Sequence, residues 1–304
     1  MNQGKAGVAT SGGVVLEPSG SVHRGNTDES KPRIASLVPS LTETLVELGL
    51  GDRLVARTRY CIHPAERVAA VPVVGGTKDV DLDRLRALAP THVVVNVDEN
   101  RRDLVAALLA WSSPPEILVT HPKDPFDNLA LIDRFAAVFG AEEGVVQRCA
   151  FWRTALQAAL SATQPEGRAT RRVLYLIWRR PWMTVARDTY LSRLLARVAW
   201  VTLPAVEGGE AGAGRYPALR GDEAWLGDVD GVLLSSEPYP FAARHIDEAQ
   251  ALCPRARVRL VDGERLSWYG TRAVPGLGYL RDLAAEMSGS RIDGDNGTWT
   301  SSSP

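Results

Sequence analysis

Aromatic and arginine side chains gather just after runs of apolar residues that predict β-strands. The gathered residues are Tyr60, Trp178-Arg179-Arg180-Pro181-Trp182, Tyr239 and Trp268-Tyr269. Ligands of open α/β sheets bind outside the carboxyl ends of the strands, so we expect these side chains to line one crevice. Flat rings offer apolar contact area to a planar ligand, and arginine pairs with acidic groups. The alternative interpretation is that the tryptophans fill hydrophobic cores.

Polar side chains lie at the end of the most apolar of these runs, at 92–97, and just after it. Asn96, Asn100 and Arg101 would offer hydrogen-bond donors and acceptors to the same crevice. Alternatively, this segment caps the next helix, for which Asn100 is a suitable N-cap. Gly75-Gly76-Thr77-Lys78 indicates a turn that ends a strand, or a direct ligand contact through Thr77. Neither GxxxxGK[ST] nor GxGxxG occurs, so no phosphate-binding loop is predicted.

Sequence signatures of catalysis and of metal binding do not occur. The motifs GxSxG, HExxH and HxxEH are absent, the five histidines are scattered, and the three cysteines are far apart. The sequence therefore predicts no catalytic residue, no metal site and no cofactor. One alternative stays open: a cytoplasmic enzyme that uses Asp98, Glu99 or Glu237 as an acid or base in the same crevice.

The elements that would position these residues alternate between strands and helices, which is typical of α/β proteins with parallel sheets. The predicted strands are 33–38, 54–56, 71–74, 92–97, 116–120, 173–178, 231–235 and 258–261. The predicted helices are 40–48, 82–88, 102–111, 127–139, 189–198, 242–252 and 279–287. Ser40, with Glu43 three residues later, predicts a capping box at the first helix.

A helical stretch without proline, at 141–162, separates the two halves of this pattern. The predicted fold class is α/β, with two Rossmann-like lobes joined by a single long helix. The predicted parts are a disordered tail at 1–31, a lobe at 32–140, the connecting helix at 141–165, a second lobe at 166–287 and a disordered tail at 288–304.

The overall charge excludes some partners. Lys and Arg number 35 against 36 Asp and Glu, a net charge of -1, so no nucleic-acid partner is expected. No run of 18 apolar residues occurs, so no membrane span is expected. Residues 1–31 show no charged start, apolar run and cleavage site of a secretory signal. As written, the sequence predicts a cytoplasmic location, and a periplasmic one if the start of translation is misassigned.

Several short motifs, in order, resemble those of the substrate-binding proteins of ABC importers for cobalamin, haem and ferric siderophores. They are Pro39-Ser40-Leu41-Thr42-Glu43, Gly75-Gly76-Thr77, Asp81-Leu82-Asp83-Arg84-Leu85 and Ala89-Pro90. Within that group the sequence is similar to the helical-backbone metal receptors. The motifs that carry this likeness are Glu99-Asn100-Arg101, Leu176-Ile177-Trp178-Arg179, Pro181-Trp182-Met183-Thr184-Val185, Ser236-Glu237-Pro238-Tyr239-Pro240-Phe241 and Ser267-Trp268-Tyr269-Gly270.

The resemblance covers about residues 33–287 and implies a function. It implies non-enzymatic binding of a corrinoid or metal chelate, such as a ferric siderophore or haem, in a cleft between two lobes. It also implies an ABC importer permease as a partner. By this likeness the ligand contacts are Tyr60, Thr77, Asn96, Asn100, Arg101, Trp178, Arg179, Trp182, Tyr239, Trp268 and Tyr269. Importer-linked members carry a signal sequence or lipoprotein cysteine, which the sequence does not show.

Overall fold

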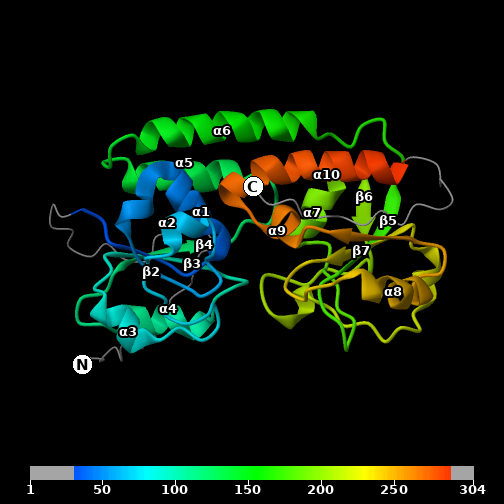
Figure 1. Ribbon diagram of the computed structural model, residues 1–304, viewed down its shortest axis with the longest axis horizontal. Helices are drawn as coiled ribbons and strands as arrows, with labels where there is room; N and C mark the ends of the chain where they lie inside the picture. The colour runs from blue at the N-terminus through cyan, green and yellow to red at the C-terminus, as the bar shows by residue number, and fades with distance from the viewer. Residues whose placement is uncertain (1–30, 289–304) are drawn as a thin grey trace, which may run out of the picture. The chain divides into compact units, whose positions relative to one another are not determined.

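The computed structural model describes residues 31–288. The predicted tails therefore lie outside the described residues, apart from Lys31 and Ser288. The chain divides into two compact units between His121 and Pro122. Figure 1 labels most of the helices and strands of both. The lobe limits predicted from the sequence stay a prediction.

The first unit contains a parallel sheet of four strands in the order β2-β1-β3-β4. The strands are β1 (Ile34–Ser36), β2 (Leu54–Arg57), β3 (His92–Asn96) and β4 (Glu116–Thr120). The helices are α1 (Pro39–Leu45), α2 (Ala65–Val68), α3 (Leu82–Ala87) and α4 (Arg102–Leu109). Every residue of β3 is buried, which explains the continuous apolar run Val93-Val94-Val95 at its centre.

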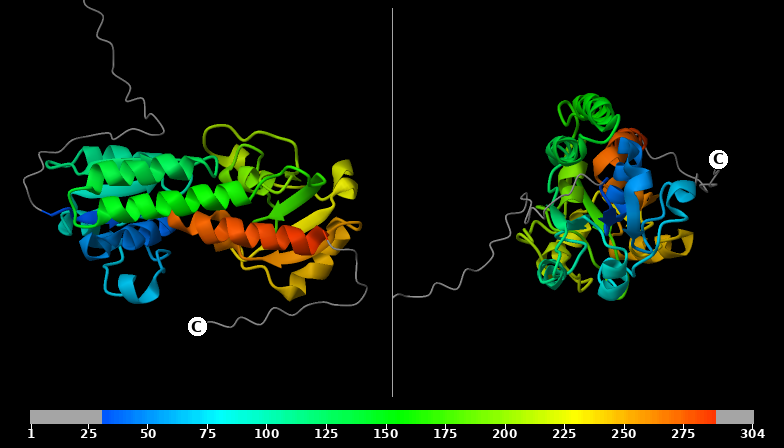
Figure 2. Two further views of the ribbon diagram at one scale, coloured as in Figure 1. Left: turned by 90° about the horizontal axis from the view of Figure 1, so that it is seen from above. Right: turned by 90° about the vertical axis from the view of Figure 1, so that its left-hand side faces the viewer.

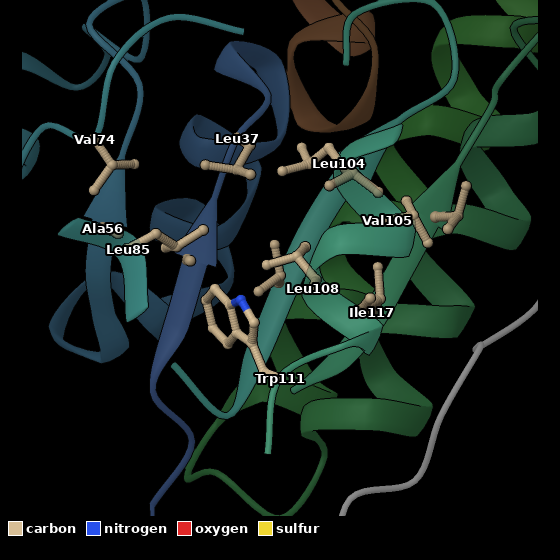
Figure 3. Packing of buried hydrophobic residues seen from close by; sticks show 13 residues of the cluster. Leu37, Ala56, Val74, Leu85, Leu104, Val105, Leu108, Trp111 and Ile117 are labelled. Atoms are coloured by element: carbon tan, nitrogen blue, oxygen red, sulfur yellow. The ribbon is translucent and has the colours of Figure 1, made fainter. Parts of the chain in front are cut away.

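Apolar side chains of α4 pack on this sheet at helical spacing. Leu104, Val105 and Leu108 are buried, and Trp111 follows them into the same core. Figure 3 shows these side chains in one cluster with Ile117 of β4. The guanidinium of Arg86 lies 5.2 Å from the centre of the Trp111 ring. Trp111 is thus a core tryptophan of the first unit.

Two local predictions for this unit are wrong. Ser40 is not the N-cap of α1: Val38 takes that place, and Pro39 begins the helix, where its fixed φ angle is already helical. Residues 71–74 form no strand. Val73 makes only an isolated bridge with Arg57 of β2, because the chain turns at Gly75, where φ is positive, before a longer ladder can form.

The second unit contains a parallel sheet in the order β6-β5-β7-β8. The strands are β5 (Arg171–Leu176), β6 (Trp200–Thr202), β7 (Gly231–Ser235) and β8 (Arg257–Val261). The helices are α5 (Asp127–Phe139), α6 (Val145–Ala162), α7 (Tyr190–Ala196), α8 (Ile246–Leu252), α9 (Gly263–Ser267) and α10 (Ala273–Ser288). The three-residue strand β6 has no counterpart among the predicted strands.

The long helix α6 stands between the two sheets in the sequence and packs beside α5 and α10 (Figure 2). It begins at Val145 rather than at 141, because Gly144 adopts a left-handed φ of 74°. Its 18 residues correspond to about 27 Å. The predicted fold class, two α/β lobes with a long connecting helix, is therefore confirmed. Among the helices of residues 31–288, none combines the length and apolar character needed to cross a bilayer.

Candidate ligand-binding site

The candidate residues of the second unit stand at the carboxyl edge of its sheet. Leu176 of β5 pairs with Leu234 of β7, and Ser235 of β7 pairs with Val261 of β8, so the three strands end side by side. The segments that leave these ends carry Trp178, Tyr239 and Trp268 respectively. This register is the reason that residues far apart in the sequence reach one edge.

Four rings at this edge form an aromatic cluster, namely Trp178, Trp182, Tyr239 and Phe241. Trp178 meets Tyr239 edge to face, with ring centres 5.6 Å apart, and Tyr239 lies 4.7 Å from Phe241. Trp182 stacks on Phe241 at 5.9 Å with planes inclined by 11°. Trp182 and Tyr239 are half-buried on the core of the unit, whereas Trp178 is 42% exposed. The cluster therefore presents Trp178 to solvent on a support of packed rings.

Arg179 lies next to this cluster and already has an acidic partner. Its Nε and Nη2 atoms lie 2.7 and 2.6 Å from Oε2 of Glu248, on α8. The hydrogen bond from Arg179 holds the pKa of Glu248 below its ordinary value, so Glu248 is ionised at neutral pH. Arg179 is predicted to pair with acidic groups of a ligand, and such a group would have to compete with Glu248 for the guanidinium.

Trp268 and Tyr269 are placed differently from Trp178. Both are buried; the indole of Trp268 packs under the guanidinium of Arg272 at 5.0 Å, and Tyr269 meets the ring of Tyr190 edge to face. Their burial fits the alternative interpretation, in which these aromatic side chains fill a hydrophobic core. Contact of Trp268 or Tyr269 with a ligand stays a prediction.

Glu237 joins the end of β7 to the segment that carries Trp268. Its Oε1 accepts hydrogen bonds from Ser267 Oγ at 2.7 Å and from Trp268 Nε1 at 2.8 Å. Partial burial is the main cause that raises the pKa of Glu237, with a smaller contribution from the nearby carboxylate of Glu264. A raised carboxyl pKa is also what an acid or base would need, but here the oxygen is committed to positioning the loop.

In the first unit, Tyr60 and Thr77 lie in the loops after β2 and before α3. Tyr60 is 52% exposed, and the guanidinium of Arg59 lies 5.8 Å from its ring centre. Arg59 in turn pairs with Asp79 at 2.7 Å. Tyr60 is therefore a partly exposed ring of the first unit, as Trp178 is of the second.

Asn96 and Asn100 are buried and organise the loop after β3. Asn96 Oδ1 accepts from the backbone N–H groups of Asp98 and Glu99, at 2.8 and 3.2 Å. Asn100 Oδ1 accepts from the N–H of Asn96 at 2.8 Å, and Asn100 Nδ2 donates to the carbonyls of Leu37 and Thr77, each at 3.1 Å. These bonds use most of the polar capacity of both amides.

The prediction that Asn100 caps the next helix is wrong by one residue. Arg101 occupies the N-cap position of α4, without a side-chain cap. Its guanidinium instead pairs with Asp103, at 2.6 Å. Arg101 and Thr77 do come together, since both line a hollow of about 460 Å³ whose other lining residues are Lys78, Asp79, Val80, Leu82, Asp103, Leu104 and Ala107.

No local sequence pattern indicates that His121 lies beside Asp98 at the carboxyl edge of the first sheet. His121 Nε2 lies 3.4 Å from Asp98 Oδ2, and the His121 side chain is almost fully buried. The signal was the adjacency of β3 and β4, because the pairing of Asn96 with Thr120 brings the next residues of both strands together. Across residues 31–288, no group of three or more histidine, cysteine or acidic side chains is arranged to hold a metal ion.

Two parallel four-stranded sheets, with the long helix α6 between them in the sequence and exposed rings at a sheet edge, define a class of α/β substrate-binding protein. Residues 34–210 match the periplasmic binding protein family, and the chain belongs to that family. Its members are non-enzymatic substrate-binding proteins. The enzyme alternative through Asp98, Glu99 or Glu237 is therefore not supported.

Solved structures show the same fold at low sequence identity. The periplasmic vitamin B12 binding protein BtuF of Vibrio cholerae has a TM-score of 0.69 and 17% identity, over 85% of this chain and 98% of that one. A periplasmic haem-binding protein of Pseudomonas aeruginosa has a TM-score of 0.68 and 22% identity, over 90% of this chain and 100% of that one. An ABC transporter substrate-binding protein of Listeria monocytogenes has a TM-score of 0.64 and 16% identity, over 84% of this chain and 98% of that one.

No curated protein matches the sequence significantly. The matched family and two of these three relatives are described as periplasmic. The predicted cytoplasmic location consequently finds no support in the comparisons.

Proposed function

We propose that this protein binds a cobalamin-like ligand or another metal chelate, a ferric siderophore or haem, for an ABC importer. The observation that carries the proposal is the aromatic cluster, with Trp178 exposed at the carboxyl edge of the second sheet. A flat ligand laid on an exposed indole removes apolar surface from water without freezing new torsions. The family supports a binding function, and two of the solved relatives are a vitamin B12 binding protein and a haem-binding protein.

The proposed contacts follow from what the structure exposes. Solvent-facing rings are offered by Trp178 and Tyr60. The Trp178 ring is supported by the aromatic cluster, which includes Trp182 and Tyr239. Thr77 and Arg101 line the hollow of the first unit. Contact with the organic shell of a chelate requires no histidine or cysteine ligand from the protein. The remaining predicted contacts, Asn96, Asn100, Arg179, Trp268 and Tyr269, would act mainly by holding the loops in place.

Titration of the full chain with cyanocobalamin, haem and a ferric siderophore tests this function. Equilibrium dialysis is the measurement, since it does not depend on tryptophan emission. We expect saturable binding of one of the three. Trp178→Ala should weaken that binding on the order of tenfold through lost contact area. No binding of any of the three would overturn the proposal.

Phe151→Ala provides the matched control. Phe151 is an aromatic residue on α6 with 65% exposure, away from the strand ends, and its ring meets Trp152 edge to face. Its replacement should leave the affinity unchanged. An equal loss of ligand affinity in both variants would mean that Trp178 makes no specific contact with the ligand.

An importer permease and a periplasmic location complete the proposal. The description of the Listeria relative as an ABC transporter substrate-binding protein supports the partner, and the family supports the location. Fractionation of cells that make the protein tests the location. Recovery in the cytoplasm alone would contradict it.

A further inference from the structure

The contact between Arg179 and Glu248 bears on which ligand edge the aromatic cluster accepts. Arg179 directly follows Trp178, and Glu248 lies in the first turn of α8. The Arg179 and Glu248 side chains are 20% and 38% exposed, so water reaches the pair and a ligand could reach it too.

The geometry of the pair uses the part of the guanidinium that a ligand acid would need. Both Nε and Nη2, which form one edge of the fork, point to the single oxygen Oε2 of Glu248. A carboxylate binds an arginine best through two parallel N–H groups on such an edge. An acidic ligand group would have to displace Glu248, or accept a poorer contact beside a like charge.

Resting on the proposed function, we propose that Glu248 is the resident counter-ion of Arg179 and makes the aromatic cluster select ligands whose edge here carries amides or other neutral groups. Glu248 is the specificity-determining residue of this pair. An amide edge meets a neutral ion pair without repulsion, whereas a carboxylate edge meets the charge of Glu248.

Two exposed arginines lie nearby: Arg180 interacts electrostatically with Glu248, and Arg244 does so with His245. They would attract an acidic ligand from a distance, whatever Glu248 does. The discrimination between acidic and neutral ligand edges that we assign to Glu248 should therefore require Arg179. The test must separate the effect of this ion pair from the effect of charges farther away.

The probes are iron protoporphyrin IX, which carries two carboxylates, and its dimethyl ester, which has the same flat ring without them. Glu248→Gln keeps the size of the side chain and removes its charge. We expect the wild-type protein to bind the ester at least as tightly as the acid. In Glu248→Gln the affinity for the acid should rise about two- to fivefold relative to the ester, the range of partly exposed ion pairs.

Asp247→Asn is the matched control, because Asp247 is the exposed neighbour of Glu248 on the same helix and carries the same charge. It should not change the ratio of affinities for acid and ester. The gain should also disappear in the double variant Arg179→Gln with Glu248→Gln. Circular dichroism and thermal melting establish that each variant is folded.

The outcomes separate this inference from the proposed function. If the wild type binds a ligand but Glu248→Gln does not favour the acid, the inference fails and the proposed function stands. If the wild type binds none of the tested ligands and Glu248→Gln binds only the acid, the inference holds and the proposed function fails. If no protein binds any probe, both fail. An equal gain in Asp247→Asn also overturns the inference.

Discussion

The indole Nε1 of Trp268 donates a 2.8 Å hydrogen bond to Oε1 of Glu237, and so joins the segment after α9 to the end of β7. The same carboxylate oxygen accepts from Ser267. This contact explains why Trp268, which the sequence places beside the other aromatic residues, is buried while Trp178 is exposed. The two tryptophans should respond differently to substitution.

Trp268→Phe should lower the free energy of unfolding by about 1–3 kcal/mol, because it removes a donor from a partly buried carboxylate. Urea denaturation at neutral pH is the measurement. Trp178→Phe is the control and should change stability by less than about 0.5 kcal/mol, since its ring is largely exposed. Equal losses in the two variants would show that the Glu237 contact contributes nothing to stability.

Glu237 should make stability depend on pH. Partial burial raises its pKa above the ordinary value of 4.5. A carboxyl with a raised pKa in the folded protein contributes stability below the unfolded pKa, and this contribution is lost as the pH rises through the folded pKa. Glu237→Gln does not titrate, so the stability of the wild type relative to this variant should fall as the pH rises above about 4.5.

Urea denaturation of both proteins between about pH 4 and pH 7 measures this difference. Subtracting the variant removes the contributions of the other titrating groups. A difference that stays constant over this range would contradict the prediction.

Asn100→Ala should destabilise the first unit. It removes three hydrogen bonds of a buried amide and leaves the N–H of Asn96 and two carbonyls without this partner. A loss of about 2–4 kcal/mol is expected. Arg101→Ala is the neighbouring control; because that side chain is exposed and pairs with Asp103 at the surface, its replacement should leave stability nearly unchanged. A small effect of Asn100→Ala would mean that water replaces its bonds.

Two glycines of α10 should give opposite results. A Cβ atom on Gly276 would strike the carbonyl oxygen of Arg265, whereas one on Gly278 would meet no atom within 4 Å. Gly276→Ala should therefore cost about 1–3 kcal/mol through overpacking. Gly278→Ala should add about 0.5–1 kcal/mol, since alanine favours a helix interior. Thermal denaturation of both variants measures the contrast, and a stabilising Gly276→Ala would contradict it.

Sequence alone sufficed for the fold class. Buried parallel strands carry continuous apolar runs, such as Val93-Val94-Val95 and Val232-Leu233-Leu234, and these are visible without coordinates. It did not reveal β6, because Trp200–Thr202 is too short to show a period. Nor did it locate the start of α6, since Gly144 could equally continue a helix or end one.

The site depended on tertiary structure to a greater extent. The sequence determined that aromatic and arginine residues follow the strand ends, because that placement needs only the order of elements along the chain. Only the tertiary structure decided that Trp178 is exposed while Trp268 is buried, and that Arg179 is paired with Glu248. Burial and ion pairing depend on which segments pack together, and residues distant in the sequence carry no local pattern that announces their contact.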